Sequence, residues 1–239
     1  MTGTIESEAP RDRSAGTILA IWAVIIISMN CVLWVSGVKL DGLTHAVELG
    51  VARAESRAVG EVSDVQIREA IHDQRETLSF WVTLAMIADF VLEPLAPALR
   101  ALAVATALGA LAALVGRPIG FGLALGEYAA LQGIWVLGLA LHVALVLTLR
   151  TDEIDTSLAL ALPAGRYQAG VWVLLRQADA FALWGWTALA MAGWRRGQAN
   201  LATSGLVCAL FAFTEAAIRV LITMTAGAAM RLMLLPDRP

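Results

Sequence analysis

The feature that most limits the fold is a run of 23 residues without a charged side chain, at positions 16–38. At a rise of about 1.5 Å per residue, a helix of this length crosses the roughly 30 Å of hydrocarbon in a bilayer. A cleavable signal peptide is the competing interpretation, because residues 35–37 could serve as a cleavage site. The run is longer than an ordinary signal core. We therefore expect a retained transmembrane helix over 15–38, preceded by a polar tail over 1–14.

The composition supports a membrane protein. Of the 239 residues, 59% are hydrophobic and 15% are charged, whereas soluble domains have about 25% charged residues. The net charge of −3 offers no basic surface, so no nucleic-acid partner is expected. Cys31 and Cys208 both lie in apolar runs and form no metal or disulfide pattern. We expect them to be packing residues, and we expect no cofactor and no metal.

A polar segment follows the first apolar run. Residues 39–77 carry five basic and eight acidic side chains. Ser63 and Gln66 are spaced as a helix-capping box, and apolar residues then recur on one helical face. We predict amphipathic extramembrane or interfacial helices over 39–92, the second of them unbroken from Ser63 to near Leu92.

Four further apolar runs predict a helical bundle over 93–230, followed by a tail over 231–239. Pro94 and Pro97 interrupt the first run, so we expect a helix to end near Leu92 and a span to follow. A turn is expected at 116–122, and a short interfacial or re-entrant helix at 166–177. The expected spans cover 97–115, 123–149, 180–194 and 201–224, and the last of them can extend beyond 224. The runs allow five or six crossings in total, and we expect five.

The distribution of basic residues predicts the orientation. Five arginines fall on one side of the membrane if the N-terminus is cytoplasmic, and basic residues favour the cytoplasmic side. They are Arg11, Arg13, Arg117, Arg195 and Arg196, whereas Arg150, Arg166 and Arg231 fall on the opposite side. We expect the 39–77 segment on the opposite side.

Five charged residues in or beside the spans are candidates for an intramembrane polar site, because such groups usually face protein or water. They are Asp89, Glu93, Asp179, Glu215 and Arg219. Glu215 and Arg219 are one helical turn apart and form either a self-neutralised pair or part of a substrate or proton path. We expect Arg219 to be shielded from hydrocarbon. Asp89 and Glu93 also share a face, but no histidine accompanies them as a metal ligand.

Asp179 is expected to have a structural role. It precedes an apolar helix and can accept hydrogen bonds from the first amides of that helix. Phe181 and Trp184 should project from one side of the same helix and pack against the last span or the segment before Pro163. His-Glu-x-x-His, Gly-x-Ser-x-Gly and P-loop motifs do not occur. We assign no catalytic residue and expect a protein that is not an enzyme.

Two stretches carry a family resemblance. Residues 174–213, "LLRQADAFALWGWTALAMAGWRRGQANLATSGLVCALFAF", resemble the end of the bacterial Yip1-like membrane proteins. The shared features are an Asp-x-Phe-x-x-Trp box at Asp179, Phe181 and Trp184, a small-residue span, a basic turn and a last span. Residues 110–141 are similar to the second and third spans of that family. Tyr128 matches the family phrase there, whereas Glu127 departs from it.

The resemblance implies a five-span bundle with a cytosolic N-terminus, in the bacterial inner membrane. Eukaryotic members of the family take part in membrane traffic and bind small GTPases. Some bacterial members are encoded beside export-system genes, which makes export-system components expected partners. The resemblance transfers no catalytic residue.

Two functions follow from the sequence. The first is a non-enzymatic partner-binding or scaffold subunit, which contacts lipid and other membrane proteins or itself through small-residue faces at 103–113 and 227–230. The alternative is a small-molecule or lipid transporter or permease component, with helices broken at Pro94 and Pro163. Its polar site would use Asp89, Glu93, Glu215 and Arg219. One shared polar cavity favours transport, and separated local pairs favour a scaffold.

Overall fold

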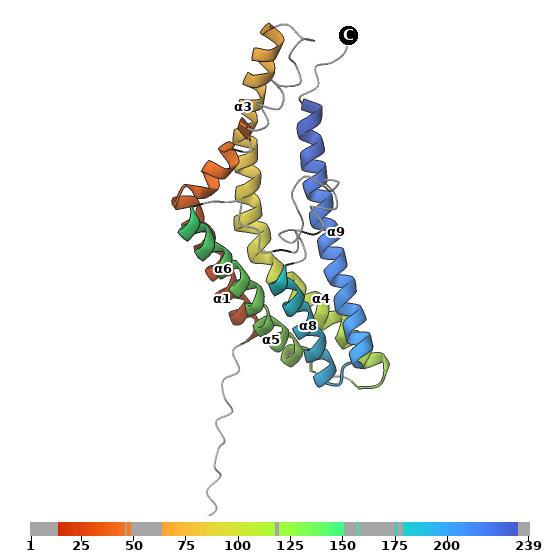
Figure 1. The fold of residues 1–239 in the computed structure, drawn as a ribbon. Coiled ribbons are helices and arrows are strands. Elements are labelled where there is room, and N and C mark those ends of the chain that lie inside the picture. Colours follow the sequence, from red (N-terminus) through yellow and green to blue (C-terminus); the bar gives the residue numbers. More distant parts are fainter. Residues whose placement is uncertain are drawn as a thin grey trace, which may run out of the picture.

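The computed structural model describes residues 14–45, 47–48, 64–117, 120–150, 157, 175 and 179–233. All regular elements in these ranges are helices, and the long ones run alongside one another (Figure 1). They are α1 (Ala15–Val35), α3 (Asp64–Ile87), the π-helical turn η1 (Ala88–Leu92), α4 (Glu93–Leu114), α5 (Phe121–Leu131), α6 (Gly133–Leu149), α8 (Ala180–Arg195) and α9 (Leu201–Met233).

Among the described residues, four segments are long and apolar enough to cross a membrane: Ala15–Val35, Arg75–Leu114, Phe121–Leu149 and Leu201–Ile222. The predicted all-helical architecture is therefore confirmed for the described residues, and four of the five predicted crossings largely overlap these segments. The remaining one corresponds to α8, whose 16 residues extend over only about 24 Å.

The first span begins and ends close to the predicted positions. Ser14 caps α1, and its hydroxyl accepts a hydrogen bond from the Thr17 amide at 3.3 Å. The helix ends at Val35, and Gly37 then adopts a φ of 81°, which a residue without a Cβ reaches at little cost. Residues 38–45 and 47–48 are helical.

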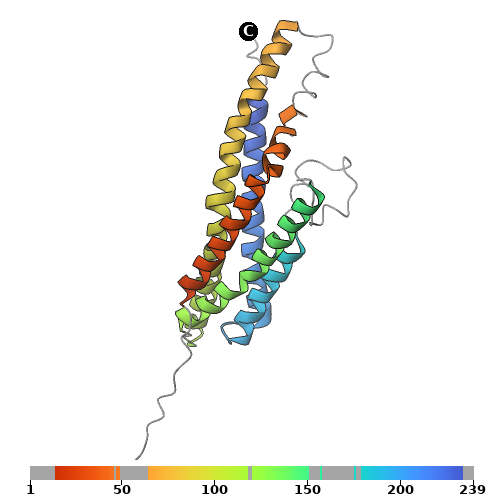
Figure 2. The same cartoon turned by 90° about the vertical axis from the view of Figure 1, so that its left-hand side faces the viewer.

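The predicted helix end near Leu92 is wrong. The chain is helical without a break from Asp64 to Leu114, through Pro94 and Pro97 (Figure 2). The apolar segment starts at Arg75, well inside the region predicted to be extramembrane. The predicted continuity up to Leu92 is confirmed from Asp64 onward, whereas the Ser63 cap lies outside the described residues.

The π-helical turn explains how the helix passes Pro94. The Glu93 amide donates to the Ala88 carbonyl, one residue further back than in an α-helix. The Asp89 carbonyl would then need the amide of Pro94, which has no N–H. Asn30 of α1 supplies the missing donor instead, with Nδ2 at 2.6 Å from the Asp89 carbonyl oxygen. A side chain from another helix thus replaces the hydrogen bond that the proline removes.

Several other predicted segments differ from the structure or lie outside it. The expected single span over 123–149 is divided by a turn at Gln132 into α5 and α6. The last helix, predicted to run from Leu201 to Met224 or beyond, continues as α9 to Met233. Apart from single residues, the loop at 150–156 and the short helix at 166–177 lie outside the described residues, as does Pro163.

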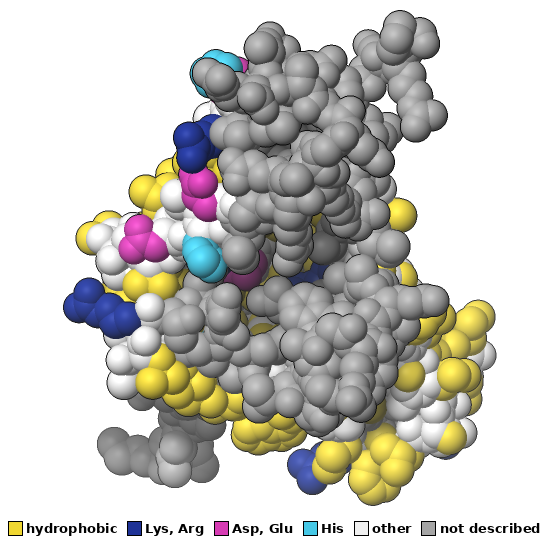
Figure 3. All heavy atoms as spheres, turned by 45° about the horizontal axis from the view of Figure 1, so that its top comes forward, with side chains coloured by type: hydrophobic (Ala, Val, Ile, Leu, Met, Phe, Trp, Pro, Cys, Tyr) yellow, Lys and Arg dark blue, Asp and Glu magenta, His cyan; other side chains and the backbone are white. Residues whose placement is uncertain are grey.

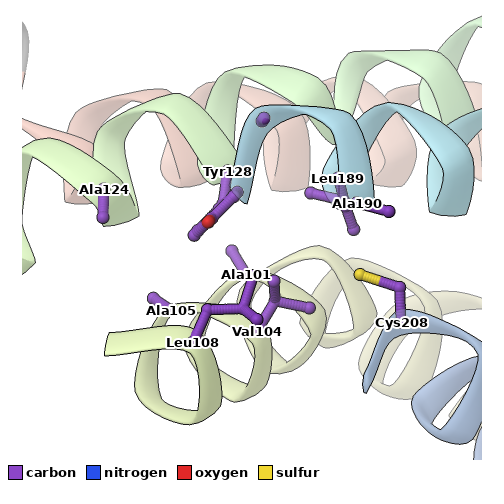
Figure 4. Close-up of a cluster of buried hydrophobic side chains, with 10 residues drawn as sticks. Ala101, Val104, Ala105, Leu108, Ala124, Tyr128, Leu189, Ala190 and Cys208 are labelled. Carbon is purple, nitrogen blue, oxygen red and sulfur yellow. The ribbon is translucent and has the colours of Figure 1, made fainter. Parts of the chain in front are cut away.

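A core of small and medium side chains joins α4 to α5, α8 and α9. Val104 and Leu108 of α4 face Tyr128 of α5 and Leu189 of α8 (Figure 4). Cys208 of α9 is buried here, as expected, whereas Cys31 is exposed on the surface of the chain. Part of the small-residue face at 103–113 is therefore used inside the chain, which corrects its assignment as a partner-binding face. The side chains of 227–230 lie outside the described ones.

Helices α6 and α8 approach closely because glycines lie opposite aromatic rings. A Cβ at Gly185 of α8 would lie 2.4 Å from the Trp135 ring, and one at Gly138 of α6 would lie 2.8 Å from Phe181. Both contacts are too short for real atoms, so only glycine allows this spacing. The close approach brings Trp135 and Asp179 to the same cavity.

Candidate functional site

The candidate site is a cavity of about 250 Å³, with walls from α1, α4, α6 and α9 and from the residue before α8. Its apolar wall includes Ile26, Pro97, Trp135 and Leu139. Its polar lining consists of Glu93, Arg100, His142, Ser157, Asp179 and Arg219.

Charged side chains are unevenly distributed over the face of the molecule that Figure 3 turns forward. In Figure 3, basic, acidic and histidine side chains gather on one side of the face that is turned forward, and hydrophobic side chains cover the lower flanks. Acidic and basic side chains are also visible further back, near the centre of this view.

The strongest polar contact of the site joins α4 to α9. Arg100 donates from Nε to Oε2 of Glu215 at 2.8 Å and from Nη2 to Oε1 at 2.6 Å. Arg219 donates from Nη2 to Oε1 of Glu215 at 2.7 Å. The Arg100 guanidinium also lies 4.8 Å from the centre of the Trp135 ring, a cation–π geometry. One carboxylate therefore holds two guanidinium groups, and both guanidiniums line the cavity.

The predicted pairing of Glu215 with Arg219 is confirmed, but the sequence analysis missed Arg100. Glu215 and Arg100 are separated by 115 positions, so no local spacing connects them. The available signal was the presence of an arginine in an otherwise apolar run, the same signal that singled out Arg219.

The predicted shielding of Arg219 from hydrocarbon stays a prediction, because the structure contains no membrane, although 48% of this side chain is exposed on the surface of the chain. Its position along α9 gives a physical reason for this exposure. Arg219 lies about 27 Å along the helix from Leu201, near the end of the apolar segment Leu201–Ile222. A long arginine side chain there can extend its charge toward the interface.

Asp89 and Glu93 share a face, as predicted, and that face is turned to α1. Oδ2 of Asp89 accepts from Nε1 of Trp34 at 2.9 Å and lies 3.5 Å from Nζ of Lys39. Oε2 of Glu93 accepts from Nδ2 of Asn30 at 3.0 Å. Glu93 lines the cavity, whereas Asp89 is held in a buried ion pair beside it. The described residues contain no group of three or more acidic, histidine or cysteine side chains that could hold a metal ion.

The predicted cap at Asp179 is wrong. Asp179 occupies the N-cap position of α8, but its side chain makes no capping hydrogen bond. Its backbone pairs with Ser157 in an isolated β-bridge, and its side chain lines the cavity. Oδ1 of Asp179 is buried and has no hydrogen-bond partner among the described residues. The carboxylate therefore contributes to the cavity rather than to the helix start.

The two aromatic residues that follow Asp179 on α8 have a structural role, because one of them packs against α6. The rings of Phe181 and Trp184 lie on one side of α8 with centroids 6.5 Å apart, as predicted. Phe181 packs against Gly138 of α6, a helix that the prediction did not name. Of the two predicted partners, the segment before Pro163 lies outside the described residues apart from Ser157. Trp184 is exposed, with 55% of its surface accessible.

A second polar cluster lies outside the cavity. Tyr128 of α5 donates to Oε1 of Gln198, and Arg196 pairs with Glu127. These contacts tie α5 to the turn between α8 and α9, and their residues do not line the cavity. They provide positions for control substitutions.

Comparison of the chain with protein-family models, with curated proteins and with solved structures finds no match. The resemblance to the bacterial Yip1-like proteins therefore stays a prediction.

Proposed function

We propose that this chain is a membrane protein that binds a small polar molecule in the charged cavity, as a transporter or permease component. One observation carries the proposal: charged side chains from α4 and α9, together with Asp179, line one cavity between apolar helices. Charged groups within membrane-spanning segments are costly, and they usually mark a substrate path or a ligand site.

The distribution of the predicted charges favours a shared cavity over separated pairs. Glu93 and Arg219 line the cavity, and Glu215 bonds to both arginines that line it. Asp89 takes no part in this network and pairs with Lys39 instead. The irregular backbone at η1 supports the same function, since π-helical turns are frequent at functional sites and this one ends beside Glu93.

Filling the cavity should abolish ligand binding without changing its charges. Ala96 lines the cavity on α4, whereas Ala110 of the same helix is exposed. Wild-type protein in lipid nanodiscs should release a small molecule on denaturation, detected by mass spectrometry, and Ala96→Phe should lose it. Ala110→Phe should retain it. Equal small-molecule contents in wild type and Ala96→Phe would contradict the proposal.

A partner-binding or scaffold role is the second candidate, and the surface of α9 favours it. Few side chains of the segment Leu201–Ile222 are buried within the chain. Leu206, Leu210 and Phe213 are all exposed and repeat at helical spacing. Another membrane helix from a second copy or a different protein could pack against this face, as could lipid.

Association through this face should depend on its large side chains. We expect cross-linking in native membranes to capture a complex of the wild type and to fail for Leu206→Ala/Phe213→Ala. The exposed Leu114 at the end of α4 offers a control, Leu114→Ala, that should cross-link normally. A wild-type chain that remains monomeric and alone in membranes and in mild detergents contradicts this role.

We place the protein in the bacterial inner membrane with a cytoplasmic N-terminus. The start of α1 lies at the same end of the bundle as the α4–α5 and α8–α9 connections (Figure 1). Arg117, Arg195 and Arg196 belong to those two connections or their edges. Basic residues in the short connections at this end support a cytoplasmic location for it.

A further inference from the structure

We infer that the cavity takes a small monovalent organic cation, with its ammonium group held by the carboxylates of Glu93 and Asp179. This inference rests on the proposed function and names the class of ligand. The evidence is the charge balance of the cavity, an acidic oxygen without a donor, and a wall that accepts an alkyl group.

The charge balance of the described residues at the cavity is negative. Arg100, Arg219, Glu93 and Asp179 line the cavity, and Glu215 bonds to both arginines. Two guanidinium groups and three carboxylates leave one formal negative charge in excess. Among the described residues this excess negative charge has no counter-charge, which is costly in surroundings of low dielectric constant, and a monovalent cation would balance it.

The hydrogen-bond partners of the site also favour a cation over an anion. Arg100 uses both Nε and Nη2 on Glu215, so an anion would have to compete with a carboxylate that is already in place. Oδ1 of Asp179 is buried without a donor among the described residues. The carboxylate of Asp179 therefore has no counter-charge among the described residues, and a cation in the cavity would supply one. Asn30 fixes the second carboxylate by donating to Oε2 of Glu93.

The size and the apolar wall favour an organic cation over a metal ion. The cavity measures about 250 Å³, whereas one water molecule occupies about 30 Å³. Ile26, Pro97 and Leu139 provide aliphatic wall beside the carboxylates. A short alkylammonium ion matches this combination, because its charge meets the acidic groups and its chain meets the aliphatic wall.

The test measures binding of three probes of similar size to the full chain in nanodiscs of zwitterionic lipid. Isothermal titration with n-butylammonium should give saturable binding, whereas butan-1-ol and butyrate should give none above empty nanodiscs. Asp179→Asn and Glu93→Gln should each weaken n-butylammonium binding by about tenfold or more, a change of about 1.4 kcal/mol. Glu127→Gln removes a carboxylate outside the cavity lining and should bind as wild type does.

The outcomes separate this inference from the proposed function. Binding of butyrate or butan-1-ol to wild type, lost in Ala96→Phe, with no n-butylammonium binding overturns the cation class and leaves a ligand-binding cavity. Equal n-butylammonium binding by wild type, Asp179→Asn and Glu93→Gln places the ammonium elsewhere and overturns the inference. Absence of binding by all three probes also overturns it. A different result contradicts the proposed function, namely equal small-molecule contents in the wild type and in Ala96→Phe.

Discussion

Replacing Glu215 by leucine is expected to lower the free energy of unfolding by about 3–5 kcal/mol, because it leaves a buried guanidinium without its counter-charge. The Arg100 side chain is only 9% exposed, and Glu215 accepts two of its hydrogen bonds. Arg219 should contribute less to the loss, because nearly half of its side chain can reach the surface. Thermal unfolding in detergent, with urea or SDS titration as a second measurement, provides the test.

Three comparisons isolate the cause of this loss. Glu215→Gln keeps an acceptor oxygen and should cost less than Glu215→Leu. Arg100→Met/Glu215→Leu should recover much of the lost stability, because replacing both buried partners by apolar residues is often neutral. Glu48→Gln breaks an exposed ion pair with Arg75, and exposed pairs contribute only about 0–1 kcal/mol.

The double variant decides what Glu215 does. If Arg100→Met/Glu215→Leu is as unstable as Glu215→Leu, the loss does not come from the stranded charge of Arg100. In that case the carboxylate stabilises the chain through Arg219 or through the packing of α9, and not through its ion pair with Arg100.

The parts of this structure that the sequence predicted depend on contacts between near neighbours in the chain. Long uncharged runs predict helices because backbone hydrogen bonds must be satisfied within the segment in a bilayer. The segments Ala15–Val35 and Leu201–Ile222 follow from that rule alone. The pair Glu215–Arg219 was equally accessible, because residues one turn apart face the same side of a helix.

The candidate site was only partly predictable because its contacts join distant parts of the chain. Arg100 reaches a carboxylate on α9, and Asp179 faces a cavity instead of the amides of its own helix. The local capping rule correctly placed Asp179 at the start of α8 but could not determine the direction of its side chain. Tertiary contacts with α4, α6 and α9 determine which of the predicted charges share a cavity.

The uninterrupted passage of the helix through Pro94 could not be predicted from the sequence for the same reason. A proline removes one backbone donor, and the usual consequence is a bend or an end of the helix. Here the donor comes from Asn30, 59 positions earlier in the chain. A single asparagine in the first apolar run was therefore a signal of a tertiary hydrogen bond, although its partner could not be read from the sequence.

This interpretation predicts that Asn30→Leu destabilises the contact between α1 and η1 specifically. Asn30 is only 2% exposed, and its Nδ2 donates to the Asp89 carbonyl and to Oε2 of Glu93. Leucine is more apolar but donates no hydrogen bond, so the Asp89 carbonyl loses the donor that replaces Pro94. We expect a loss of about 1–3 kcal/mol, the usual penalty for leaving a buried acceptor unpaired.

Amide hydrogen exchange shows where in the chain the Asn30→Leu variant loses stability, whereas thermal unfolding gives only the size of the loss. Because Asn30 tethers the π-helical turn, Asn30→Leu should raise amide exchange at Ala88–Leu92 more than in the core of α4. Ser28→Ala is the matched control, since its exposed hydroxyl bonds only to the Val24 carbonyl of its own helix. An Asn30→Leu variant with wild-type stability and unchanged exchange at η1 would show that the helix passes Pro94 without this side chain. The carboxylate of Glu93 would then owe its position in the cavity to α4 alone.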